Sequence, residues 1–103
     1  MQCAIQTVMV CSDPAVCVRG TAQTINLPPA LTVDVGQRLI SGAATGRTIK
    51  ITSVEREGGR LLISGSEVGG SWTMAVVEAS GAMSSAVIAR NGGFLMFGSC
   101  SAN

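Results

Sequence analysis

Four cysteines are the residues of this sequence whose side chains are best suited to chemistry. They stand at positions 3, 11, 17 and 100 of a 103-residue chain, an even number that permits three disulfide pairings. Asp13-Pro14 is a strong turn start, because proline fixes φ and the aspartate can bond a backbone N–H further along. That turn would bring Cys11 close to Cys17 and leave Cys3 to pair with Cys100, so we predict these two bonds.

The predicted bonds carry consequences for stability and for compartment. In the chain-entropy model the short loop stabilises the fold by about 2 kcal/mol and the long loop by about 4.7 kcal/mol. Because disulfides persist in oxidising compartments, we expect a periplasmic or secreted protein. The alternatives are a four-cysteine zinc site, whose usual tight cysteine pair is missing, and ordinary buried thiols of a cytosolic protein. Lipidation of Cys3 is a third alternative, but it would leave another cysteine unpaired.

Other side chains that commonly perform catalysis are scarce. The chain has no histidine, no tyrosine and one lysine, so serine–histidine and cysteine–histidine pairs are absent. Lys50 lies between threonines on the polar face of a predicted strand, which is typical of a solvated lysine. Glu55 and Glu57 fall at a predicted turn that would expose both, whereas a carboxylate-pair hydrolase needs acids facing each other. We therefore predict no enzyme activity, no metal site and no cofactor.

Charge and hydropathy exclude two further classes of partner. Seven Lys and Arg against six Asp and Glu give a formal charge of +1, so no basic field is present for nucleic acid or an anionic membrane. No stretch approaches the roughly 20 apolar residues of a membrane-spanning helix. The start Met1-Gln2-Cys3 lacks the charge and apolar run of a signal peptide, so we interpret the chain as a mature form with an added initiator methionine.

Candidate binding residues are the single tryptophan and three methionines. Trp72 opens a predicted strand after Gly69-Gly70-Ser71, where it either fills one end of the core or forms an exposed binding anchor. Met74, Met83 and Met96 fall one on each of the last three predicted strands. They either fill the core or form a soft, adaptable ligand surface.

The elements that must position these residues are short strands. Residues 47–54 alternate apolar and polar side chains, which predicts a half-buried strand, and further strands are predicted over 60–64, 72–78, 82–89 and 94–100. Glycine-containing turns separate them, with Asn91-Gly92 as a strong hairpin signal. The first half is less regular, with strands expected over 4–10, 16–25, 31–35 and 38–41. Residues 84–88 keep a helical turn open as an alternative.

These turns recur at the spacing of an antiparallel meander. We predict an all-β fold in one domain spanning residues 1–103: a small antiparallel up-and-down barrel or barrel-like sandwich of about eight strands, cross-linked by two disulfides. Closure into a barrel removes exposed sheet edges. A bond between Cys3 and Cys100 independently places the first and last strands side by side.

The chain resembles a loose group of small exported alphaproteobacterial β-barrel proteins of uncharacterised role. An N-terminal cluster of Cys3, Cys11 and Cys17, a glycine-punctuated β-meander and the ending Phe97-Gly98-Ser99-Cys100 carry the resemblance over nearly the whole chain. The plan also looks like that of small periplasmic protease inhibitors built on an eight-stranded barrel. Those act through an N-terminal tail, whereas here a bond at Cys3 would tether the tail.

Three functions follow as hypotheses. The first is a non-enzymatic exported binding module for a protein or a small apolar ligand. The second is a self-associating structural or assembly component of the envelope or of a particle, because 47% hydrophobic residues are more than a lone small barrel easily hides. The third is a protein similar to periplasmic protease inhibitors.

Overall fold

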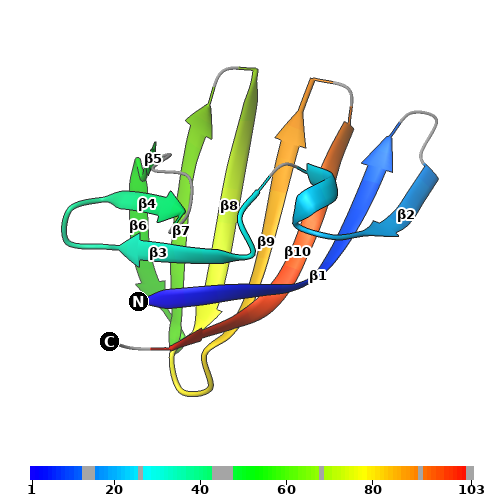
Figure 1. Ribbon diagram of the computed structural model, residues 1–103. Helices are drawn as coiled ribbons and strands as arrows, with labels where there is room; N and C mark the ends of the chain where they lie inside the picture. The colour runs from blue at the N-terminus through cyan, green and yellow to red at the C-terminus, as the bar shows by residue number, and fades with distance from the viewer. Residues whose placement is uncertain (13–15, 26, 43–47, 68, 91, 102–103) are drawn as a thin grey trace.

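The computed structural model describes residues 1–12, 16–25, 27–42, 48–67, 69–90 and 92–101, which form an all-β fold with one short 3-10 turn (Figure 1). The elements are β1 (Gln2–Ser12), β2 (Val16–Gly20), η1 (Gln23–Ile25), β3 (Ala30–Asp34), β4 (Leu39–Gly42), β5 (Thr48–Lys50), β6 (Ser53–Glu57), β7 (Arg60–Glu67), β8 (Gly70–Val77), β9 (Ala82–Ala89) and β10 (Gly92–Ser101).

One antiparallel sheet contains all of these strands, in the order β5-β4-β3-β1-β10-β9-β8-β7-β6, with β2 paired to β1. The sheet curls on itself, so that β3 and β4 run across the front of β6, β7 and β8 (Figure 1). The predicted all-β, antiparallel, barrel-like class is confirmed. The meander continues from β6 to β10, but the first half departs from a simple up-and-down order because β1 pairs with β3 and β10.

The described part has ten strands rather than about eight. One of the additional strands arises because a single predicted strand is divided in two. The alternating segment 47–54 divides into β5 and β6 at Ile51-Thr52. The Ile51 N–H donates to the Arg38 carbonyl near β4, whereas the Thr52 N–H donates to the Ser64 carbonyl of β7 at 2.9 Å. These two bonds carry the chain from one edge of the sheet to the other, and so bring the two edges together at this corner.

Strand β1 changes partners along its length. Its register with β10 shifts between Ile5 and Thr7, which marks a β-bulge. Before the shift β1 pairs with β3, and after it β1 pairs with β2. The bulge therefore bends β1 so that one strand serves both the front layer and the long back wall.

Tight turns connect the strands of the meander. Gly58 and Gly59 join β6 to β7 with φ of 59° and 76°, the left-handed conformation that a primed two-residue turn needs. Asn91 of the predicted hairpin lies outside the described residues. Residues 84–88, where the sequence left a helical turn open, lie in the middle of β9, so the helical alternative is wrong.

The core lies on the concave side of the sheet, where alternate residues of each strand point inward. It is made of buried side chains at Cys3, Leu31, Val33, Ile40, Ile51, Leu61, Ile63, Met74, Val76 and Met83. Both predicted disulfides are present, Cys3–Cys100 between β1 and β10 and Cys11–Cys17 between β1 and β2. Disulfides of this kind are typical of proteins in oxidising compartments.

Candidate functional site

An apolar cavity, here named the inner cavity, lies on the concave side of the sheet with a volume of about 130 Å³. Its walls come from the front layer (β3 to β5 with the segment around η1) and from the back wall (β7 to β10) (Figure 1). Its lining residues are Ile25, Leu27, Leu31, Ile40, Ile49, Glu67, Trp72, Met74, Ser85, Val87, Phe94 and Met96. A concave, mostly apolar site with few polar groups is the usual form of a small-molecule site.

Trp72 lines this cavity and carries a buried hydrogen-bond donor that is unpaired among the described residues. It stands opposite Gly65 in the β7–β8 ladder, and its ring lies against that glycine, since a Cβ at Gly65 would come within 3.0 Å of the indole Cε2. Within the part of the chain that the structure describes, the buried Nε1 has no hydrogen-bond partner. Leaving such a donor unpaired costs about 1–3 kcal/mol, so an acceptor oxygen brought by a ligand would be favoured there.

Two of the three predicted methionines join Trp72 at the inner cavity. Met74 and Met96 line it, each with only 3% of its surface exposed. Met83 is equally buried, but it pairs with Val76 further along the sheet and belongs to the packed core. Thioether side chains adapt to irregular ligand shapes, so Met74 and Met96 give the cavity a deformable floor.

Ser85 is the buried polar residue of β9 and also lines the inner cavity. Its Oγ donates a hydrogen bond to the Thr73 carbonyl of β8 at 2.8 Å. The Ser85 hydroxyl therefore already has an acceptor for its proton, whereas the Trp72 N–H has none among the described residues. The hydroxyl oxygen of Ser85 can still accept a bond from a ligand.

A second hollow, here named the rim cavity, adjoins the inner cavity. Its volume is about 340 Å³, and it shares Glu67, Trp72, Val87 and Phe94 with the inner cavity. Arg90 also lines it, with its guanidinium Nη2 placed over the turn at Gly69. The two cavities therefore share a wall, and the rim cavity is lined by one cation, Arg90, and one carboxylate, Glu67.

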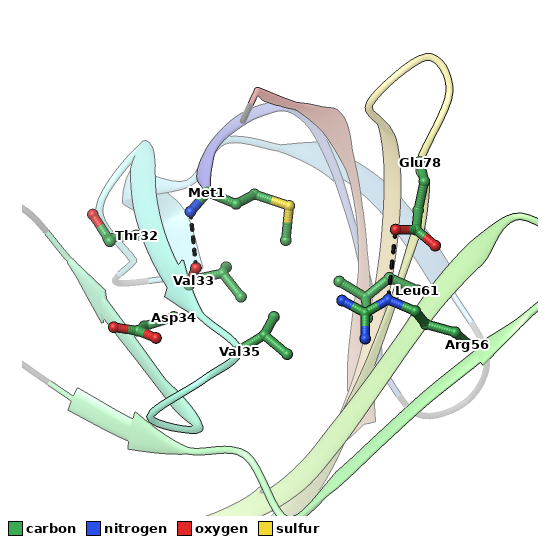
Figure 2. A pocket seen from close by; sticks show the side chains of 8 residues that line it. All are labelled: Met1, Thr32, Val33, Asp34, Val35, Arg56, Leu61 and Glu78. Carbon is green, nitrogen blue, oxygen red and sulfur yellow. Dashed lines mark hydrogen bonds and ion pairs between the residues drawn. The ribbon is translucent and has the colours of Figure 1, made fainter. Parts of the chain in front are cut away.

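A third hollow, here named the seam hollow, opens between β3 and the β6–β7 hairpin, at the opposite end of the sheet, and its volume is about 360 Å³. Figure 2 shows Met1, Val33 and Val35 on one wall, facing Arg56, Leu61 and Glu78 on the other. Its polar groups are paired. The Met1 ammonium donates to the Val33 carbonyl at 3.0 Å, and Arg56 Nε lies 3.6 Å from Glu78 Oε2.

The convex face of the sheet presents apolar side chains to solvent. Leu95 and Phe97 of β10 are 43% and 44% exposed. They border a shallow hollow of about 190 Å³, here named the outer groove, whose floor includes Thr73, Ala75 and Ala86. The four adjacent strands β1, β10, β9 and β8 contain no charged residue. Exposed apolar surface of this kind is typical of interaction sites.

The acidic and basic residues considered for catalysis are not gathered into a site. Lys50, Glu55 and Glu57 are all exposed on β5 and β6. Among the described residues, no group of three or more His, Cys, Asp or Glu side chains is arranged to hold a metal ion. In the same residues no helix has the length and apolar character needed to cross a membrane.

Sequence reasoning missed Arg90, Val87 and Phe94 of the cavities and Leu95 and Phe97 of the outer face. Phe94 to Phe97 form one continuous apolar run, so period-two alternation does not tell which side chains face the core. The hairpin signal at Asn91-Gly92 was the one available clue, since it places Arg90 at a turn and therefore at an open end of the sheet.

Comparison with known proteins adds no relative to this picture. A scan against protein-family models, a search of curated proteins and a search of solved structures each gave no match. The predicted resemblance to exported alphaproteobacterial β-barrel proteins is not tested by these comparisons.

Proposed function

We propose that this protein is a non-enzymatic binding module, periplasmic or secreted, that holds a small apolar molecule in its inner cavity. One observation carries the proposal: a mostly apolar cavity is lined by Trp72, Met74 and Met96, and the indole N–H of Trp72 is buried with no partner in the described residues. The ligand accordingly has an apolar body and an oxygen that accepts a hydrogen bond from Trp72.

The size of the cavity sets the size of the ligand. A cavity of about 150 Å³ holds a benzene-sized molecule, and the inner cavity has about 130 Å³. Half-buried side chains such as Ile25, Leu27 and Phe94 lie along its wall and can adjust to a guest. A ring or a chain of about six carbons is the expected body of the ligand.

Disulfides support the export part of the proposal. Cys3–Cys100 and Cys11–Cys17 leave no free cysteine among the described residues. Such bonds survive in the periplasm and outside the cell, where reducing systems do not remove them.

The experiment is a titration with 1-hexanol followed by fluorescence of Trp72, the single tryptophan of the chain. We expect saturable binding that Val87→Phe weakens at least roughly tenfold, because the larger ring fills the inner cavity. Val77→Phe is the matched control, since Val77 is 38% exposed and lines none of the four hollows described above. Absence of saturable binding, or equal weakening by both variants, would contradict the proposal.

A second candidate function, self-association, is favoured by the convex face. That face carries both raised side chains, Leu95 and Phe97, and the outer groove with its floor of small side chains. The raised side chains of one copy could enter the outer groove of another, and both features lie on the same surface. The occupant that matches this surface is therefore a second copy of the chain related by a two-fold axis. The absence of charge from β1, β8, β9 and β10 removes the repulsion that would oppose such pairing.

Sedimentation velocity over a concentration series tests the second candidate. A dimer that Phe97→Ser dissociates and Val18→Ser leaves intact supports it, because Val18 is exposed but lies on β2. A monomer at every concentration would contradict it. The protease-inhibitor alternative has less support, since residues 2–12 are hydrogen-bonded within the sheet as β1 and do not form a free tail.

A further inference from the structure

We infer that the ligand is an anionic amphiphile: its apolar body lies in the inner cavity and its carboxylate meets Arg90 in the rim cavity. This inference rests on the proposed function and adds the chemical class of the ligand. The first step is spatial, because the two cavities share Trp72, Val87, Phe94 and Glu67 as walls. A guest longer than the inner cavity therefore extends into the rim cavity.

The second step concerns charge. Arg90 is exposed, and its guanidinium has no hydrogen bond or ion pair within the described residues. Glu67, the acidic residue of the rim cavity, already has an interaction of its own. Arg90 is therefore the cation of the rim cavity that has no partner among the described residues, and a guanidinium matches the two oxygens of a carboxylate.

The third step concerns the shape of the turn that carries Arg90. Gly69 precedes β8, and the nearest side-chain atom to a Cβ placed there is Arg90 Nη2 at 4.0 Å. The end of the Arg90 side chain thus lies next to the Gly69 turn, and both residues line the rim cavity. Its charge stands where the head group of a guest in the inner cavity would emerge.

The experiment compares 1-hexanol, hexanoate and hexylammonium, which share one chain and differ in head-group charge. At neutral pH and about 10 mM salt, where the Debye length is about 30 Å, we expect hexanoate to bind roughly two- to fivefold more tightly than hexanol. That range is the one expected for an exposed charge pair. Hexylammonium should bind more weakly than hexanol, and about 1 M salt should remove both differences.

Arg90→Gln should reduce hexanoate affinity to that of hexanol and leave hexanol binding unchanged. Arg60→Gln is the matched control, because it removes the same charge from an exposed residue at the opposite end of the sheet, beside Val77. Equal affinities of the unaltered protein for hexanol and hexanoate would overturn the inference and leave the proposed function standing. Absence of binding by all three compounds would overturn both.

Discussion

The inner cavity and the seam hollow are both openings in the same curled sheet, but they differ in whether their polar groups have partners within the chain. In the seam hollow the Met1 ammonium and the Arg56–Glu78 pair are already partnered within the chain. In the inner cavity the Trp72 Nε1 is buried without a partner in the described residues. The seam hollow is the larger, about 360 Å³ against about 130 Å³. An unsatisfied buried group, and not volume, therefore distinguishes the candidate binding site.

The difference follows from how the sheet curls. The seam hollow lies where β3 faces the β6–β7 hairpin without a hydrogen-bonded ladder between them in the described sheet, and charged groups line that gap. The inner cavity lies where the front layer covers the back wall, and its surface is mostly apolar. Substitutions at each region should therefore have separable effects on stability and on binding.

The largest expected effect comes from the disulfide that links β1 to β10. Replacing Cys3 and Cys100 together by serine should lower the free energy of unfolding by roughly 4.7 kcal/mol, against about 2 kcal/mol for Cys11 and Cys17. The physical reason is loop length, since the bonds close sequence separations of 97 and 6 residues. Urea unfolding of both variants measures this difference, and equal losses would contradict the loop-length account.

The next prediction compares how much stability is lost when a side chain of the packed core or one of the cavity wall is truncated. Ile63→Ala should cost about 2–5 kcal/mol, because Ile63 is 1% exposed and its removal leaves a cavity in the core. Val87→Ala should cost about 1 kcal/mol or less, because the half-buried Val87 already borders an empty space. Thermal or urea unfolding checks the order, and a larger loss for Val87→Ala would show that the inner cavity is closed in solution.

The smallest effect is expected at the seam hollow. Arg56→Gln should change the free energy of unfolding by less than about 1 kcal/mol, since the ion pair with Glu78 is exposed and screened by solvent. Hexanol binding should not change, which fluorescence titration of Trp72 would show. Weakened hexanol binding in this variant would mean that the seam hollow, and not the inner cavity, takes the ligand.

Much of the fold could be predicted because its signals are local. The Cys11–Cys17 pairing, predicted from a local turn signal, is confirmed, although the Asp13-Pro14 turn itself lies outside the described residues. A glycine-containing turn between predicted strands is likewise observed at Gly58-Gly59. The division of residues 47–54 at Ile51-Thr52 could not be predicted, because it depends on carbonyls of Arg38 and Ser64. Pairing of β1 with β3 depends in the same way on a bulge that alternation does not reveal.

The candidate site could be predicted only in part. Residue type indicated Trp72, Met74 and Met96, but it also indicated Met83, which cross-strand register places in the core. Register also places Gly65 opposite Trp72, which makes room for the indole. Register depends on pairing between distant segments, and a single sequence does not contain it.

Calorimetric titration of Trp72→Phe tests the central claim most directly, namely that the unpaired indole N–H donates a hydrogen bond to the ligand. The variant removes a buried unsatisfied donor, which favours the free protein, and part of a ring packed against the core, which disfavours it, so the test is read from affinity and not from stability. Its affinity for hexanol should fall several-fold, because one hydrogen bond contributes about 0.5–1.5 kcal/mol. Affinity for cyclohexane, which has no acceptor, should stay unchanged. An undiminished affinity for hexanol would contradict the claim.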